Sequence, residues 1–447
     1  MGSHYLVVGL GKTGRGVSRF LLERGEQVIA VDDQLKWEDL PPLFQKSPNF
    51  QLLPSDWWDK LSPCWIKEGI VSPGFSPEHP LLRLAMQKGI PLISEIDFSS
   101  RYLRFPLIGV TGSNGKSTTV ALISHICAQA GLPVFVGGNL GIPLVEALKE
   151  ESLFQWGVVE VSSFQLELTC STRFQLAGIT NFFPNHLDRH HTLEQYFQTK
   201  LKIFDNQKGK DLSLVNFTSS WWSPKICQAL RAQVVPLSIS AVPSAGFWIK
   251  DNLVFESSKL EPLFSLDNWQ LPGRHNLENL VFAVGVCRLI GISPSYIESA
   301  LVTFRGLPHR LEKVGNFQGI DWYNDSKSTT PSATKIAVET LDRPMILILG
   351  GRAKLDDFSE LHQLWNENRV KAVVIYGESR ETIRDNLSPV FNCHLVADVP
   401  EAVSLARTLA LAGDVVLFSP ACTSWDQYSN FEERGDHFKR LVYEIYQ

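Results

Sequence analysis

Short runs of apolar, mostly β-branched residues recur along the chain, and most of them lead into an amphipathic segment. Within the runs, apolar residues do not alternate with polar ones, which indicates strands buried on both faces, as in parallel sheets covered by helices. Repeated alternation of such runs with helical segments is typical of the α/β class. The predicted strands are Tyr5–Gly9, Gln27–Asp32, Leu107–Gly112, Trp156–Val161, Leu176–Asn181, Pro344–Gly351, Val370–Gly377 and Asp414–Ser419.

These runs fall into three blocks, in line with the roughly 150 residues that one domain usually has. The first block, 1–93, ends where a new helix-like segment begins. The second block, 94–305, has an irregular and β-rich middle at Trp221–Asp267, and the third block is 306–447. We therefore predict an α/β protein with three domains.

Composition narrows the classes of protein that fit. The 447 residues are 44% hydrophobic and 20% charged, which is typical of folded globular proteins. With 42 basic and 47 acidic residues, the net charge of −5 gives no basic field for nucleic acid or an anionic membrane. The seven cysteines lie far apart and include no C-x-x-C pair, a pattern typical of reduced thiols. No run approaches the roughly 18 apolar residues of a membrane span, so we expect a cytoplasmic protein without membrane insertion.

The segment Gly109–Thr118 has the context of a phosphate-binding loop. It follows an apolar strand and precedes a helix, and its glycines would let backbone N–H groups approach phosphates. Lys116 would reach the β- and γ-phosphates, and the hydroxyl of Ser117 or Thr118 would bind Mg²⁺. The strict G-x-x-x-x-G-K-[ST] spacing is not met, because Val110 stands where the first glycine is expected. A helix-capping turn with a surface lysine is the structural alternative.

Two residues could complete a magnesium site beside this loop. Glu160 ends a predicted strand, and an acidic residue at the carboxyl end of a strand next to a phosphate loop is well placed to bind Mg²⁺. His186 lies shortly after the next predicted strand and could be a further ligand. By itself, however, such a histidine is more often a capping or surface residue.

Lys200 occupies an unusual position. The segment Thr192–Phe204 reads as a helix, and Lys200 falls seven residues after Leu193 on its apolar stripe. In one interpretation, the aliphatic part of Lys200 lies along the apolar surface while its ammonium group extends into water. The pattern alone favours this interpretation. The other is a desolvated lysine with a lowered pKa, whose neutral amine could react with CO2 to form a carbamate that binds a metal.

Several motifs together resemble the ATP-dependent Mur ligases of peptidoglycan synthesis, over essentially the whole chain. Lys200 matches the lysine that these enzymes carbamylate. The other matching segments are Thr111–Thr118, Glu160 with Ser162–Gln165, Asn185–Arg189, Gly273–Asn279, Pro308–Arg310 and Asn324–Thr329.

The resemblance implies a Rossmann-like N-terminal domain for a UDP-sugar, a central P-loop ATPase-type domain and a Rossmann-like C-terminal domain for an amino acid. It implies catalytic roles for Lys116, Glu160, His186 and Lys200. One Mg²⁺ would bind Ser117 or Thr118 with Glu160, and a second would bind Glu160, His186 and N6-carboxylated Lys200. The implied ATP contacts are Gly112, Ser113, Asn114, Gly115, Lys116, Ser117, Thr118, Asn279, Arg310 and Asp325.

Within the family, the sequence is most similar to the members that add D-glutamate to UDP-N-acetylmuramoyl-L-alanine. The features that favour this branch are Gly9–Gly14 with Ser72–Gly74, Asn139, and Ser419–Phe431. The sequence departs from the expected pattern at Lys12, Asp33, Gln34, Trp425 and Gly350–Lys354. The implied substrate contacts are Gly11, Lys12, Thr13, Asp32, Ser72, Gly74, Asn139, Ser162, Gln165, Lys327, Thr329, Lys354, Ser424 and Phe431. We expect a monomer whose domains close around these substrates.

Other functions remain open from the sequence. The run Gly9-x-Gly-x-x-Gly14 with Asp32 also fits a dinucleotide fingerprint, which would indicate an NAD-dependent oxidoreductase. A nucleotide-dependent switch would leave His186 and Lys200 without a role. Another Mur-type ligase is a closer alternative. So is a folylpolyglutamate-type ligase, which shares the phosphate loop but generally lacks this N-terminal block.

Overall fold

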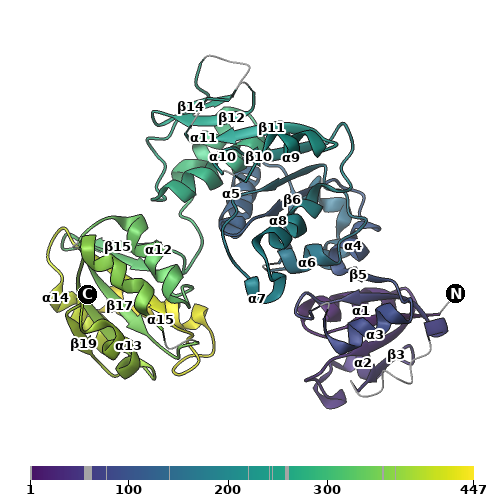
Figure 1. Cartoon of the computed structure of the whole chain (residues 1–447), viewed down its shortest axis with the longest axis horizontal. Coiled ribbons are helices and arrows are strands. Elements are labelled where there is room, and N and C mark those ends of the chain that lie inside the picture. Colours follow the sequence, from purple (N-terminus) through teal and green to yellow (C-terminus); the bar gives the residue numbers. More distant parts are fainter. Residues whose placement is uncertain are drawn as a thin grey trace. The chain divides into compact units, whose positions relative to one another are not determined.

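In a computed structural model of the chain, residues 3–447 are described apart from 55–62, 77, 140, 220, 241, 244, 257–260, 355–356 and 368, with the backbone alone at 63, 188 and 365–367. The described residues form three sheets (Figure 1). Contacts divide the chain into two compact units: unit 1 comprises 1–269 and 277–303, and unit 2 comprises 270–276 and 304–447. The first and second predicted domains fall largely in unit 1 and the third in unit 2.

The first sheet has five parallel strands in the order β3-β2-β1-β4-β5. Val7 of β1 belongs to one apolar cluster and its neighbours Leu6 and Val8 to another, as expected when both faces of a strand are covered. Its elements are β1 (His4–Val8), α1 (Lys12–Glu23), β2 (Gln27–Val31), α2 (Pro42–Gln45), β3 (Phe50–Leu53), β4 (Ile66–Val71), α3 (Pro80–Gln87), β5 (Leu92–Ser94) and α4 (Glu95–Ser100).

The second sheet has the order β14-β13-β12-β11-β10-β9-β6-β8-β7, parallel from β7 to β12 and antiparallel at β13 and β14. The predicted helix 192–204 is α-helical to Leu201 and continues as a 3-10 turn. The elements are β6 (Leu107–Thr111), α5 (Lys116–Gln129), β7 (Val134–Gly138), β8 (Trp156–Glu160), α6 (Ser163–Glu167), β9 (Leu176–Ile179), α7 (Leu187–His190), α8 (Leu193–Leu201), β10 (Leu212–Asn216), α9 (Pro224–Ala229), β11 (Gln233–Ser238), β12 (Phe247–Lys250), β13 (Leu253–Glu256), β14 (Phe264–Ser265), α10 (Arg274–Leu289) and α11 (Pro294–Thr303).

The third sheet, in unit 2, has the order β15-β16-β20-β17-β18-β19, and only β15 is antiparallel to its neighbour. Helices α12 and α13 contribute to the apolar cluster on one face, and α14 and α15 to the cluster on the other. The elements are β15 (Glu312–Phe317), β16 (Ile320–Asn324), α12 (Pro331–Leu341), β17 (Met345–Gly350), β18 (Val370–Tyr376), α13 (Arg380–Leu387), β19 (Cys393–Leu395), α14 (Val399–Leu409), β20 (Val415–Ala421) and α15 (Phe431–Glu444).

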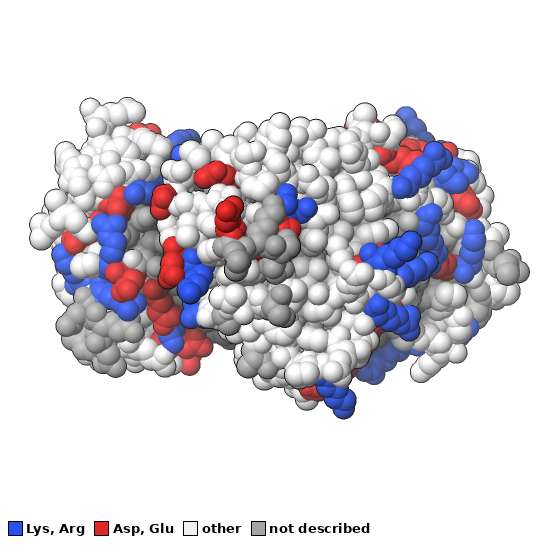
Figure 2. All heavy atoms as spheres, turned by 90° about the horizontal axis from the view of Figure 1, so that it is seen from above, with Lys and Arg blue, Asp and Glu red and all other residues white. Residues whose placement is uncertain are grey.

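The mixed α/β architecture and all eight predicted strands are confirmed, with ends that differ by a residue or two. On the face drawn in Figure 2, basic and acidic side chains lie in several small groups of either sign. This distribution agrees with the small net charge of −5. None of the described helices has the length and apolar character needed to cross a membrane.

Candidate active site

The register of the central sheet brings several predicted site residues to one edge. Parallel pairing places Glu160 of β8 opposite Val110 of β6, and Gly138 of β7 opposite Glu160. On the other side of β6, Thr111 lies opposite Ile179 of β9. The phosphate loop, Glu160 and Asn139 therefore all follow the carboxyl ends of adjacent parallel strands, which is where ligands bind in such sheets.

The phosphate loop connects β6 to α5, as predicted, and only glycine fits at two of its positions. Gly112 has a φ of +150°, and a Cβ atom there would lie 2.0 Å from Thr180 Oγ1. Gly115 has a φ of +81°, and a Cβ atom there would lie 2.1 Å from Asn279 Oδ1. Thr119, in the first turn of α5, donates to the same Asn279 oxygen over 3.2 Å. Asn279, one of the implied ATP contacts, thus lies beside the loop.

Hydrogen bonds fix the shape of the loop. Asn114 N donates to Asn181 Oδ1 over 2.9 Å, and Ser113 Oγ donates to Phe183 O over 2.9 Å. Lys116 Nζ donates to the carbonyl oxygens of Gly112 and Ser113 over 2.9 and 3.0 Å. Ser117 is half-buried whereas Thr118 is buried, so Ser117 is the more accessible of the two candidate metal ligands. A turn with a surface lysine does not describe this loop, because Lys116 lies against it.

Glu160 is held in place at the end of β8. Its side chain is 2% exposed. Asn139 Nδ2 donates to Glu160 Oε1 over 2.9 Å, and Asn139 N donates to Glu160 O over 2.8 Å. Two predicted site residues thus contact each other. The exposed position of Asn139 leaves it accessible to a ligand.

Lys200 lies inside the protein. It is 1% exposed, and its Nζ donates to Gly112 O over 2.9 Å and lies 4.5 Å from the centre of the Tyr196 ring. Burial, together with the nearby charge of Lys116, lowers the pKa of Lys200 well below its ordinary value. The interpretation that its ammonium reaches water is therefore wrong, because the amine is buried, and the lowered pKa favours the neutral form.

His186 occupies an exposed turn close to the same aromatic residues. It precedes α7 with a φ of +53°, in the left-handed region. Its ring centre lies 4.9 Å from that of Phe164 and 6.2 Å from that of Tyr196. Tyr196 is the residue whose ring lies 4.5 Å from Lys200 Nζ. The Asp188 side chain in the same motif lies outside the described part.

The described residues contain no group of three or more His, Cys, Asp or Glu side chains that could hold a metal ion. The predicted magnesium ligands include only two such residues, Glu160 and His186, and rely otherwise on a hydroxyl and on a modified lysine. Oxygen donors of this kind suit Mg²⁺, and the glycine cradle at Gly112 and Gly115 suits a phosphate. The chemistry of the residues present is therefore compatible with Mg²⁺ and a nucleotide.

The N-terminal glycine turn lies next to the predicted serine loop. A Cβ atom on Gly14 would lie 1.8 Å from Gly9 O, so the first turn of α1 requires glycine there. Ser72 Oγ donates to Gly9 O over 2.9 Å, and Asp32 Oδ2 accepts from Leu10 N over 2.7 Å. The predicted contacts Gly11, Lys12, Thr13, Asp32, Ser72 and Gly74 follow strands β1, β2 and β4, which are adjacent in the sheet.

Two other predicted substrate contacts have a structural role at the start of a helix. Ser162 and Gln165 form a reciprocal capping box at the start of α6.

Arg189 was not predicted as a site residue, although it belongs to the matching segment Asn185–Arg189. Its guanidinium pairs with Glu167 and donates to Pro73 O and Phe75 O over 3.3 and 3.0 Å. It thereby ties the histidine turn to the Ser72–Gly74 loop. The Asp-Arg pair in the motif is the signal that could have identified it.

In unit 2, Asp325 lies at the end of β16 close to the Arg310 turn. Asp325 accepts from Leu311 N over 3.1 Å and from Ser419 Oγ over 2.7 Å. Burial raises the pKa of Asp325 to about 6, although these hydrogen bonds and Arg310 oppose the shift. Nε of Arg310 is buried and has no hydrogen-bond partner in the described part of the chain. The matching segment Gly273–Asn279 is divided, with His275 in unit 2 and Asn279 in unit 1.

The residues expected to bind the amino acid lie on three loops that follow adjacent strands. Lys327 and Thr329 follow β16, Lys354 follows β17, and Ser424 follows β20. Lys354 Nζ lies 3.5 Å from Thr329 Oγ1, and Lys327 Nζ lies 5.4 Å from the centre of the Phe431 ring. The structure therefore brings these predicted residues together in pairs.

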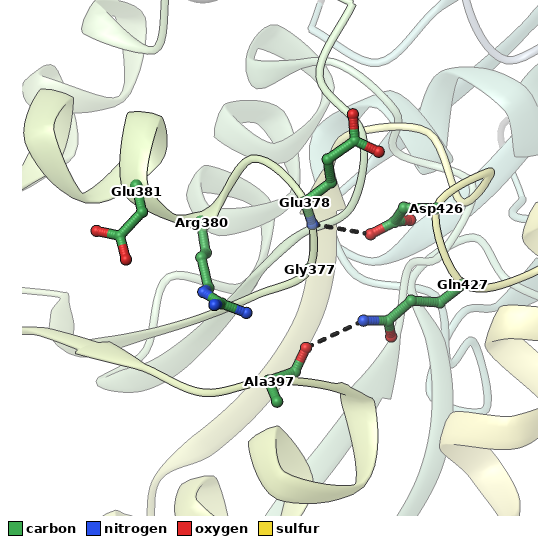
Figure 3. Close-up of a pocket in the computed structure, with 7 residues that line it drawn as sticks. All are labelled: Gly377, Glu378, Arg380, Glu381, Ala397, Asp426 and Gln427. Atoms are coloured by element: carbon green, nitrogen blue, oxygen red, sulfur yellow. Dashed lines mark hydrogen bonds between the residues drawn. The ribbon is translucent and has the colours of Figure 1, made fainter.

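The loop after β20 also lines a pocket of about 370 Å³ (Figure 3). Asp426 accepts from Glu378 N over 3.1 Å, and Gln427 Nε2 donates to Ala397 O over 3.0 Å. The remaining lining residues, from the loop after β18 and the start of α13, are Gly377, Arg380 and Glu381. No pattern in the sequence indicated this pocket.

Comparison with known proteins agrees with a nucleotide-dependent ligase. Residues 3–94 match the Mur ligase MurD-like N-terminal domain, 110–287 match the Mur ligase middle domain, and 309–422 match the Mur ligase glutamate ligase domain. These matches identify the chain as an ATP-dependent ligase. The chain belongs to the Mur ligase family.

Curated relatives are similar over nearly their full length. The chain is 36% identical to the UDP-N-acetylmuramoylalanine–D-glutamate ligase of Syntrophus aciditrophicus, covering 99% of this chain and 98% of the relative. It is 37% identical to the ligase of the same name from Geotalea uraniireducens, with 98% and 96% covered. Among solved structures, the MurF ligase of Thermotoga maritima in complex with ADP has a TM-score of 0.59 at 16% identity, covering 99% of this chain and 96% of that one.

Proposed function

We propose that this chain joins D-glutamate to UDP-N-acetylmuramoyl-L-alanine with consumption of ATP, in the cytoplasmic synthesis of peptidoglycan precursors. A carboxylate does not condense with an amine in water at a useful rate, because hydroxide is a poor leaving group. The γ-phosphoryl group of ATP is therefore first transferred to the alanyl carboxylate. The amine of D-glutamate then attacks the acyl phosphate, and phosphate leaves the tetrahedral intermediate. The names of the full-length relatives support this choice of substrates.

The phosphate loop positions ATP for the first step. Phosphoryl transfer depends mainly on positioning and on stabilisation of charge. Lys116 and the loop amides hold the phosphates, after Lys116 exchanges its bonds to the loop carbonyls for phosphate oxygens. We assign adenine to Asn279, the γ-phosphate to Arg310 and the ribose to Asp325.

Ser117 or Thr118, Glu160, His186 and Lys200 as its carbamate would hold Mg²⁺, which neutralises charge that develops on the phosphoryl oxygens. The burial of Lys200 against the phosphate loop is the single observation that carries the proposal. An amine there is close to Lys116 and favours its neutral form. A neutral amine can add CO2 and release a proton, which converts this position into an anionic oxygen ligand.

The remaining sites serve the two substrates that are joined. The turn at Gly11, Lys12 and Thr13 with Asp32, Ser72 and Gly74 would hold the uridine diphosphate, and Asn139, Ser162 and Gln165 would contact the rest of this substrate. On unit 2, Lys327 and Lys354 would pair with the carboxylates of D-glutamate, assisted by Thr329, Ser424 and Phe431.

Phosphate release tests this function directly. The full-length protein is assayed with Mg·ATP and UDP-N-acetylmuramoyl-L-alanine across a panel of D- and L-amino acids. We expect rapid release only with D-glutamate. Release that depends on another amino acid would indicate another member of the family, and release without any amino acid would contradict a ligase.

A further inference from the structure

Arg434 is a buried cation for which the proposed reaction has no role. It lies in the first turns of α15 with 0% of its surface exposed. Within the described part of the chain, no carboxylate forms an ion pair with it. An arginine cannot lose its proton to escape this cost, and a buried charge without compensation is strongly destabilising. The local structure must therefore compensate the guanidinium by other means.

Backbone oxygens and one hydroxyl provide this compensation. Nε donates to Ser326 Oγ over 3.0 Å, and Nη2 donates to Ser326 O and Cys422 O over 2.8 and 3.1 Å. Ser326 Oγ in turn donates to Phe431 O over 2.8 Å, at the start of the same helix. Nη1 lies beside Gly351, since a Cβ atom there would be 3.1 Å from it. One guanidinium thus contacts loops that follow three adjacent strands, β16, β17 and β20.

Each of these loops carries residues of the proposed amino-acid site. Ser326 directly precedes Lys327, Gly351 lies three residues before Lys354, and Cys422 lies two residues before Ser424. We propose that Arg434 is a positioning residue that fixes these loops relative to one another and so sets the affinity for the amino acid. Because Arg434 is fully buried, it acts through its hydrogen bonds to these loops and does not touch the substrate. This inference rests on the proposed function for the location of the site.

The surrounding backbone leaves little freedom for another arrangement. Ala421, next to Cys422, has a φ of +61°, which is unfavourable for a residue with a Cβ atom, and its N–H donates to Ser328 O over 3.0 Å. A Cβ atom on Gly435 would lie 2.2 Å from His309 Nδ1, so the first turns of α15 also press against the turn that carries Arg310. A shift of Arg434 would therefore be transmitted to the loops and not absorbed.

The planar fork of arginine is what this position requires. Two nitrogens of Arg434 reach acceptors on two loops at once, whereas the single ammonium of a lysine cannot match this geometry. Arg434→Lys should accordingly retain the charge but hold the loops less well. Arg434→Met keeps a long side chain but leaves Ser326 O and Cys422 O without their donor.

Steady-state kinetics of the full chain test the proposal. In Arg434→Met we expect KM for D-glutamate to rise about tenfold or more, since hydrogen bonds to a charged group are lost, while KM for ATP and for UDP-N-acetylmuramoyl-L-alanine stays within about twofold. Arg434→Lys should fall between this variant and the wild type. The matched control is Arg440→Met, at an exposed position on the same helix. A folded Arg434→Met with unchanged KM for D-glutamate, or with all three KM values raised alike, would overturn the proposal.

Should Arg434→Met fail to fold, Ser326→Ala provides a related test, because it removes the hydroxyl acceptor of Nε together with the hydrogen bond from that hydroxyl to Phe431 O. A rise of about threefold in KM for D-glutamate is expected, and no rise would contradict the role of Arg434. The wild type separates this inference from the proposed function. If it uses another amino acid, the same comparison of KM values is made with that amino acid, and the outcome for Arg434 is decided independently.

Discussion

Lys200 in unit 1 and Arg434 in unit 2 are both buried cations that donate to loop carbonyls following parallel strands, yet the protein accommodates them in opposite ways. Lys200 shares the Gly112 carbonyl with Lys116, and its pKa is lowered so that the neutral amine is favoured. Nε and Nη2 of Arg434 instead donate to oxygens of Ser326 and Cys422. Lys200 can lose its proton and thereby become a nucleophilic amine, whereas Arg434 cannot, and its hydrogen bonds hold the loops together.

The largest effect is expected at the loop that Lys200 contacts. Lys116→Ala removes the cation to which we assign the stabilisation of charge on the transferred phosphoryl group, so ligation should fall by roughly 10³-fold or more while the fold persists. Steady-state phosphate release measures the loss, and Lys208→Ala, at an exposed lysine of the same unit, is the control. Near-wild-type turnover in Lys116→Ala would remove the phosphate loop from the mechanism.

Lys200→Ala tests the chemical side of the comparison. Ligation should fall about 10²-fold or more because an anionic metal ligand is lost, and added acetate or formate should restore part of the rate by occupying the space. High-resolution mass measurement of the wild type should find one added carboxyl group on this lysine. If Lys200→Ala ligates normally, the carbamate plays no part.

The next prediction concerns the edge of the N-terminal sheet. The proposed uridine diphosphate site there depends on close packing of the glycine turn and not on a buried cation. In Gly14→Ala the added methyl group would meet Gly9 O at 1.8 Å, so the turn must shift. We expect uridine diphosphate to bind the full chain about tenfold more weakly in this variant, by calorimetry. Gly209→Ala is the control, since a Cβ atom there meets nothing within 4 Å. Binding of NAD in place of uridine diphosphate would support the dinucleotide alternative.

The smallest effect concerns stability against pH. Because the folded state lowers the pKa of Lys200, the unfolded chain binds one more proton just below the ordinary lysine value of 10.5. Stability of the wild type should therefore rise with pH through this window relative to Lys200→Met, which lacks the titration. Chemical denaturation of both proteins, freed of CO2 so that Lys200 carries no carboxyl group, at several pH values between 8 and about 10.5 measures the difference. Parallel curves would show that Lys200 is not buried as a neutral amine.

Much of the fold, and the phosphate loop at the edge of the second sheet, could be predicted because they depend on local sequence patterns. Uninterrupted apolar runs identified the strands, and strand, glycines, lysine and helix in sequence identified the phosphate loop. The apolar stripe that contains Lys200 predicted that this side chain lies on the apolar face of its helix, but it did not predict that the amine is buried. Its environment depends on Gly112 and Tyr196, and Gly112 is far away in the sequence.

Arg434 could not be found in the same way, although a similar signal was present. It lies three residues after Phe431 and four before Phe438, on the apolar stripe of α15. The run Glu432-Glu433-Arg434 reads as an ordinary charged helix start, because the carbonyls that receive the guanidinium belong to loops up to 108 residues away. Sequence spacing identifies a cation on an apolar stripe, and only tertiary structure shows what compensates it.

We assign acyl-phosphate formation to the sheet edge beside Lys200 and amino-acid capture to the loops that Arg434 contacts. Trapping the acyl phosphate with hydroxylamine, in the absence of amino acid, separates the two steps, because hydroxylamine displaces phosphate and leaves a hydroxamate. We predict that Lys200→Ala forms almost no hydroxamate, whereas Arg434→Met forms it at close to the wild-type rate but ligates D-glutamate poorly. Equal loss of hydroxamate in both variants would contradict this division of roles.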